Sequence, residues 1–207
     1  LGGLSTGQIS QLTTAQVSAF NSVNIKGLST AQLNALGTGK ISALEVVDVG
    51  ALVSAQWRGF STAQLAQFNT GQVASIGSSA IVGLSTEQVD ALSTTQLAAL
   101  TTVNIRGLSS GQLGAIATAK VSALETADVL VLSSAQVLGL SAGQLQQLST
   151  VQVGALSSVA VRGLSTAQLS ALGTAKMSAL EEADVGALLS AQWRGFSTAQ
   201  LAQLSLI

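Results

Sequence analysis

The chain is built from an eight-residue unit that repeats without a break from Leu4 to Leu204. When each octad is counted from Leu4, position 1 is Leu, Phe or Ile in all 26 occurrences, and position 6 is a large apolar residue in all 25. Position 2 is most often Ser, position 3 Ser or Thr, position 5 Gln, and position 8 Ala or Gly. This periodicity is typical of repeat proteins, in which each unit packs only against its neighbours.

The spacing of the apolar residues limits what an octad can form. One continuous helix would rotate the pattern by about 80° per octad, because eight residues exceed two turns of 3.6 residues. A strand would place positions 1 and 6 on opposite faces. A short helix that restarts in every octad buries both positions. Ser29-Thr30-Ala31-Gln32 has the pattern of a capping box, and positions 1 and 6 have the spacing of a hydrophobic staple around it.

Helices of about one and a half turns are unstable in isolation, so these helices must stack. We therefore predict an all-α solenoid, a superhelix of short capped helices with one helix per octad. The alternative is a β-solenoid, in which octads form the faces of each coil. The abundance of Ala and the scarcity of β-branched residues at outward positions favour the helical fold.

A longer period lies above the octad. Seven octads end in Gly after an unusual residue at position 7, and they divide a single continuous array into modules of three or four octads: 4–27, 28–59, 60–83, 84–107, 108–139, 140–163, 164–195 and the partial module 196–207. We expect one coil per module, with these glycines stacked where backbones approach closely. The array spans residues 1–207, starts without Met and stops inside an octad, so we expect a segment of a longer polypeptide.

The composition removes most catalytic chemistry. The chain has no His, Cys, Pro or Tyr, so it lacks an imidazole base, a thiol nucleophile and the usual ligands of zinc, haem and iron–sulfur clusters. We predict no catalytic residue, no cofactor and no metal site. A net charge of -1 provides no field to attract nucleic acid. Polar residues return every few positions, so no segment has the roughly 18 apolar residues of a membrane helix.

The four-octad modules carry a recurrent set of charges. Their Lys, Glu and Asp residues are Lys40, Glu45 and Asp48, then Lys120, Glu125 and Asp128, then Lys176, Glu181 and Asp184. A functional interpretation is a cation site or an acid pair. We favour a structural interpretation, in which Lys and Asp at position 5 of successive octads are stacked neighbours that replace a Gln–Gln contact. The predicted pairs are Lys40–Asp48, Lys120–Asp128 and Lys176–Asp184.

Two Trp-Arg pairs also allow a functional and a structural interpretation. Trp57-Arg58 and Trp193-Arg194 could form a platform for carbohydrate or nucleic acid. Because Trp occupies position 6, we interpret it as a core residue with an exposed Arg after it.

Units such as Leu-Ser-Thr-Ala-Gln-Leu-Ser-Ala-Leu at 164–172 resemble repeat tracts of very large exported bacterial proteins described as adhesins or exoproteins. The resemblance covers essentially the whole chain and implies export and a role outside the cell or at its surface. Together with the repetition, it leads us to expect a structural segment of an extracellular filament, sheath or giant adhesin that associates with identical copies. The alternatives are a repeat surface that binds ice or a surface glycan, and a passive spacer that presents a terminal domain.

The octad assignment makes a direct prediction about stability. Leu148→Ala removes a position 1 side chain in the middle of the array and should lower the free energy of unfolding by about 2–5 kcal/mol. Ser170→Ala, at position 7, should be nearly neutral. Denaturant unfolding of both variants measures this difference, and equal effects would show that the octad frame is wrong.

Overall fold

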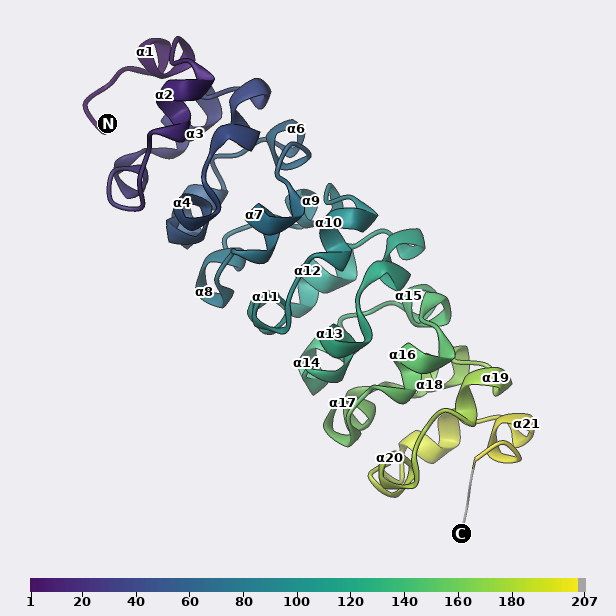
Figure 1. Ribbon diagram of the computed structural model, residues 1–207. Coiled ribbons are helices and arrows are strands. Elements are labelled where there is room, and N and C mark those ends of the chain that lie inside the picture. The colour runs from purple at the N-terminus through teal and green to yellow at the C-terminus, as the bar shows by residue number, and fades with distance from the viewer. Residues whose placement is uncertain (205–207) are drawn as a thin grey trace. The chain divides into compact units, whose positions relative to one another are not determined.

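The computed structural model describes residues 1–204 and contains short helices joined by extended residues (Figure 1). The described residues form no strand, so the predicted all-α solenoid is confirmed and the β-solenoid alternative is wrong. The chain falls into two compact units, Leu1–Leu108 and a second unit that begins at Ser109.

Each unit contains short α-helices and a few 3-10 helices. The first unit comprises α1 Thr6–Ser10, α2 Thr14–Ser18, η1 Ile25–Gly27, α3 Thr30–Ala35, η2 Thr38–Ala43, α4 Val46–Ala51, α5 Ser54–Trp57, α6 Thr62–Leu65, α7 Thr70–Ala74, α8 Ser78–Ile81, α9 Thr86–Asp90, α10 Thr94–Ala98 and α11 Thr102–Gly107. The second comprises α12 Ser110–Ala115, η3 Thr118–Ala123, α13 Thr126–Leu130, α14 Ser134–Leu138, α15 Ala142–Gln147, α16 Thr150–Gly154, α17 Ser158–Gly163, α18 Thr166–Ala171, α19 Thr174–Met177, α20 Glu182–Gly186, η4 Gln192–Gly195 and α21 Thr198–Leu201.

The capping box starts most of these helices at position 3 of the octad. At α3, the backbone N–H of Gln32 donates to Ser29 Oγ at 3.3 Å, and the backbone N–H of Ser29 donates to Gln32 Oε1 at 2.7 Å. Asn69 and Thr101 cap α7 and α11 in the same way. Each box satisfies two of the N–H groups that a helix start leaves without a partner.

Positions 1 and 6 form the core, as the spacing predicts. Leu28 is 3% exposed and Leu33 is fully buried. The same holds along both units, with Leu4, Leu12, Trp193 and Leu201 half-buried in the terminal coils. Burial of a side chain of this size stabilises the folded state by roughly 1.5–3 kcal/mol.

Helices pack against helices three octads away in both units. In the first unit α5 packs on α8 and α8 on α11, and in the second α14 packs on α17 and α17 on α20. The three-octad offset also holds inside the four-octad modules, where α3 packs on α5 and α12 on α14. The prediction that module length sets coil length is therefore wrong. Every octad turns the chain through a similar angle, and the module pattern only marks which octads end in Gly.

Six of the seven module-ending glycines lie where two backbones meet, as predicted, whereas a Cβ on Gly27 would have no atom within 4 Å. A Cβ on Gly59 would lie 2.6 Å from Thr30 Cα, and one on Gly163 would lie 2.5 Å from Ser134 Cα. Gly195 meets Thr166 in the same way. Glycine is needed here for close approach, since φ is positive only at Gly37 and Gly173 among the described residues.

This close approach predicts opposite outcomes for two Gly→Ala changes in the second unit. Gly163→Ala should destabilise by at least about 2 kcal/mol, because the new methyl group meets backbone atoms that cannot move without separating the coils. Gly111→Ala, inside α12 with open space around it, should stabilise by about 0.5–1 kcal/mol. Thermal melts of the two variants measure this difference. Similar destabilisation by both changes would contradict the close backbone approach at Gly163.

Candidate functional site

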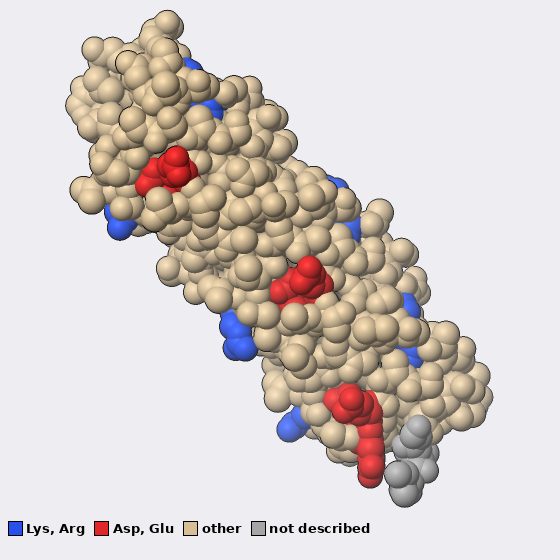
Figure 2. Space-filling view, in the orientation of Figure 1, with Lys and Arg blue, Asp and Glu red and all other residues tan. Residues whose placement is uncertain are grey.

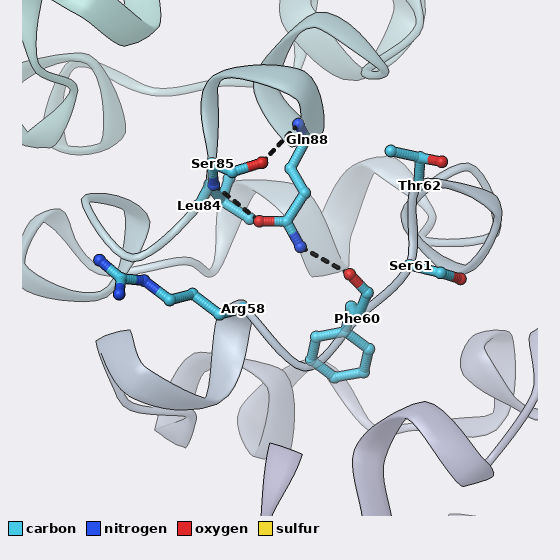
Figure 3. Close-up of a pocket in the computed structure, with 7 residues that line it drawn as sticks. All are labelled: Arg58, Phe60, Ser61, Thr62, Leu84, Ser85 and Gln88. Atoms are coloured by element: carbon cyan, nitrogen blue, oxygen red, sulfur yellow. Dashed lines mark hydrogen bonds between the residues drawn. The ribbon is translucent and has the colours of Figure 1, made fainter. Parts of the chain in front are cut away.

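The glutamine side chains at position 5 join successive coils. At Gln88, Oε1 accepts from the backbone N–H of Ser85 at 2.7 Å, and Nε2 donates to the carbonyl oxygens of Trp57 at 2.9 Å and Phe60 at 2.6 Å. Figure 3 shows the amide between its own helix start and the Phe60 carbonyl. Gln88 is 5% exposed. One buried side chain therefore caps its own helix and satisfies the end of a helix in the preceding coil.

The arrangement recurs in both units. Glutamine Nε2 atoms donate to carbonyl groups 31 and 28 residues earlier, at Gln56, Gln72, Gln88 and Gln96 in the first unit and Gln144, Gln168 and Gln192 in the second. Gln8 and Gln16, in the first coil, are exposed and cap only their own helices. We call this buried row the glutamine ladder. The sequence predicts the capping half of each contact but wrongly predicts Gln–Gln contacts for the other half.

Lysine at position 5 also donates to the preceding coil. Lys40 Nζ lies 2.5 Å from the carbonyl oxygen of Ser10, 30 residues earlier. Lys176 Nζ lies 3.3 Å from the carbonyl oxygen of Leu145 and contacts that of Gln146. Burial lowers the pKa of Lys176. Lys120 is half-buried at the equivalent position. The carbonyl groups that receive an amide in most octads therefore receive a cation in two of them.

Aspartate at position 5 is buried but cannot donate a hydrogen bond while it is charged. Asp48 and Asp128 are each 2% exposed, and Asp184 is 4% exposed. Asp184 accepts from Ser158 Oγ at 2.9 Å and from the backbone N–H of Glu181 at 3.2 Å. Asp128 Oδ2 is buried without a hydrogen-bond partner. Figure 2 shows the acidic side chains of the second unit in two patches on a mostly uncharged face.

The buried carboxyl groups have raised pKa values. Burial, and secondarily the negative charge of Glu125, raises the pKa of Asp128 to about 6, although the backbone N–H of Glu125 partly offsets this. Burial and the charge of Glu45 also raise the pKa of Asp48. The pairings Lys40–Asp48, Lys120–Asp128 and Lys176–Asp184 stay predictions. The contacts of Lys40 and Lys176 run back to the preceding coil, whereas each predicted partner lies in the next octad.

A surface hollow lies in the first unit, beside the ladder. It has a volume of about 530 Å³ and is lined by Arg58, Phe60, Ser61, Thr62, Leu84, Ser85 and Gln88 (Figure 3). Its interior side is closed by Phe60, which packs with Trp57 and Phe68 in an aromatic cluster with ring centroids 5.3–5.5 Å apart. Trp57 is fully buried and Arg58 is exposed, which confirms the interpretation of this pair as a core residue followed by a surface residue.

The described residues contain neither a metal-binding cluster of side chains nor a membrane helix. Within residues 1–204, no group of three or more His, Cys, Asp or Glu side chains is arranged to hold a metal ion. No helix in this part of the chain is both long and apolar enough to cross a membrane.

Comparison with known families identifies the repeat. A model of the ALTTAQ repeat matches residues 41–78, 74–102, 121–158 and 152–182, which together make up more than half of the chain. The chain belongs to the ALTTAQ repeat family. No curated protein matches it. The ALTTAQ match covers octads of both compact units, and the ladder residues Gln72 and Gln144 lie within it.

The ladder of the ALTTAQ repeats predicts that Gln and Glu are not interchangeable within it. Gln96→Glu keeps the oxygen that caps α10 but loses the donors to the Leu65 and Phe68 carbonyls, so it should destabilise by about 2–5 kcal/mol at pH 7. Gln16→Glu is the matched control, because its amide has no coil behind it. Like most surface substitutions, the control should be neutral within about 0.5 kcal/mol. Chemical unfolding measures both variants, and an equal loss in the free energy of unfolding for Gln96→Glu and Gln16→Glu would rule out the ladder.

The buried Asp128 carboxylate predicts an unusual pH dependence of the free energy of unfolding. The pKa of Asp128 in the folded state, about 6, exceeds the ordinary value of 3.8, so its protonation stabilises the fold below about pH 4 and this contribution is lost as the pH rises toward 6. In metal-free buffer, Asp128→Asn should therefore raise the free energy of unfolding at pH 7 by on the order of 2 kcal/mol and change it little at pH 4. A loss of stability at pH 7 would instead support the Lys120–Asp128 pair.

Proposed function

We propose that this chain is a non-catalytic structural segment of an extracellular bacterial filament, sheath or giant surface adhesin, and that it associates with identical copies. The observation that carries the proposal is how the polar groups are used. The position 5 side chains are directed inward and hold the coils together, so the outer surface keeps short hydroxyl groups, few charges and single aliphatic side chains. Repeat solenoids of this kind provide extended surfaces rather than enclosed sites.

The exposed aliphatic side chains support contact with other copies. In the second unit Leu138 is 57% exposed on α14, and Val159 is 64% exposed on α17, the helix packed against α14. Val103 on α11 is 54% exposed in the first unit. A net charge of -1 gives little electrostatic repulsion between copies. The resemblance to exported bacterial repeat tracts supports a location outside the cell.

Electron microscopy and sedimentation of the full-length protein test this proposal. We expect polymers, and we expect the double change Leu138→Lys and Val159→Lys to reduce assembly without lowering the melting temperature. The double change Thr126→Lys and Thr150→Lys, at exposed hydroxyl positions on the packed helices α13 and α16, is the charge-matched control and should leave assembly intact. A full-length protein that stays monomeric and is not displayed at the surface would overturn the proposal.

One observation favours a second candidate, a surface for ice or a glycan. Position 3 hydroxyl groups are exposed on stacked helices, as at Thr70 on α7 and Thr94 on α10. Such rows offer regularly repeated hydroxyl groups with little charge. Thermal hysteresis and glycan-array binding measure this activity, and negative results in both would exclude the candidate.

A further inference from the structure

A hollow in the second unit exposes aliphatic side chains at positions that are small or polar in most octads. It has a volume of about 290 Å³ and is lined by Ser134, Val159, Arg162 and Leu189. These residues come from α14, α17 and the segment after α20, three helices that pack in this order (Figure 1). Val159 is 64% exposed at position 4, where Ala or Gly is usual, and Leu189 is 46% exposed at position 2, where Ser is usual. An exposed apolar patch with a polar rim is typical of a binding surface.

Arg162 adds a positive charge to this hollow, which we call the Arg162 hollow. The side chain is exposed, and among residues 1–204 it has neither an ion pair nor a hydrogen bond. A guanidinium group presents N–H donors in a planar fork that matches a carboxylate. The Arg162 hollow therefore fits a partner that combines a carboxylate with aliphatic side chains.

The first unit carries such a combination at the start of α4. Glu45, Val46 and Val47 follow one another along the chain and are all exposed, Val46 by 45% and Val47 by 68%. The Glu45 carboxylate forms no ion pair with any residue among 1–204. The other two octads with Glu at position 2 have Thr126-Ala127 and Glu182-Ala183 in place of the two valines. We call residues 45–47 the Glu45 ridge, and its valines have no counterpart that the repeat requires.

We propose that the Glu45 ridge of one copy of this chain binds in the Arg162 hollow of a second copy. The Glu45 carboxylate accepts hydrogen bonds from the Arg162 guanidinium, and the two valines cover Val159 and Leu189. Opposite charges beside matched apolar surfaces fix both the partner and the register of such a contact. The inference rests on the proposed self-association and names the two surfaces that carry it.

The contact joins two different surfaces, so it leaves each copy with one unused partner surface. A heterologous contact of this kind adds copies head to tail, and it produces an open filament unless the rotation between copies closes a ring. It therefore supplies the geometry that a filament requires. A contact between two identical surfaces would stop at a dimer.

The hollow beside Arg58 shows what gives the Arg162 hollow its selectivity. Arg58 occupies the same octad position and is also exposed. Its octad has Ala55 at position 4, and the hollow is bordered by Ser85 at the place that corresponds to Leu189. The Arg58 hollow thus has the cation without the exposed aliphatic side chains, so it should not bind the Glu45 ridge.

Charge reversal in the full chain, followed by sedimentation velocity, tests the contact. Arg162→Glu and Glu45→Arg should each raise the protein concentration needed for assembly by at least about tenfold, because each places like charges across the contact. Arg58→Glu and Glu125→Arg are the matched controls at the same octad positions, and they should assemble like the unchanged chain. Thermal melts of the four variants should show no loss of melting temperature, since all four side chains are exposed.

Two combinations separate a direct contact from an indirect effect. The double change Glu45→Arg with Arg162→Glu should restore assembly, because it exchanges the charges of the pair. An equimolar mixture of the two single variants should also assemble, although neither does so alone, since each variant offers the charge that the other lacks.

Failure of both combinations to assemble would overturn the contact, as would equal losses in the controls or unchanged assembly in both single variants. Each of these results leaves the filament proposal standing, because the unchanged chain still forms polymers. An unchanged chain that stays monomeric would overturn the filament proposal and this contact together.

Discussion

The structure depends on one side chain that meets two needs. A helix as short as these leaves almost all of its backbone N–H and C=O groups without intrahelical partners, so its ends decide its stability. Glutamine at position 5 supplies an oxygen to its own helix start and an amide to the carbonyl groups of the preceding coil, as Gln88 does. Glutamate can provide only the first of these contacts. This difference explains why Gln fills position 5 in 15 of 25 octads and Glu in none.

The glycine positions and the apolar core follow from the short separation between coils that these hydrogen bonds impose. Amide-to-carbonyl bonds of about 3 Å bring backbones together, so some octads must end in Gly, as Gly59 does against Thr30. Positions 1 and 6 then fill the interior with one apolar pair per octad. Lysine can replace the amide donor because it also donates, whereas aspartate cannot. Asp48 and Asp128 are therefore places where the ladder of donors is interrupted.

The sequence predicts the local half of this arrangement because local rules determine it. The capping box at Ser29 and Gln32, the burial of positions 1 and 6, and the close approach at the module-ending glycines all follow from spacing and residue type. The number of octads per coil does not follow, because it depends on the angle between successive helices. The alternation of three-octad and four-octad modules therefore misled the coil prediction. The destination of the amide and of the Lys40 ammonium group was missed for the same reason, since these contacts run between coils at offsets that match no repeat in the sequence.

A high-resolution crystal structure that orients the side-chain amides tests the central claim most directly. The decisive quantity is the distance from Gln96 Nε2 to the carbonyl oxygens of Leu65 and Phe68. The account predicts hydrogen bonds near 2.8 and 2.9 Å, with Oε1 toward the backbone N–H of Ser93. Amides that face solvent or one another would contradict it, as would coils held together by strands.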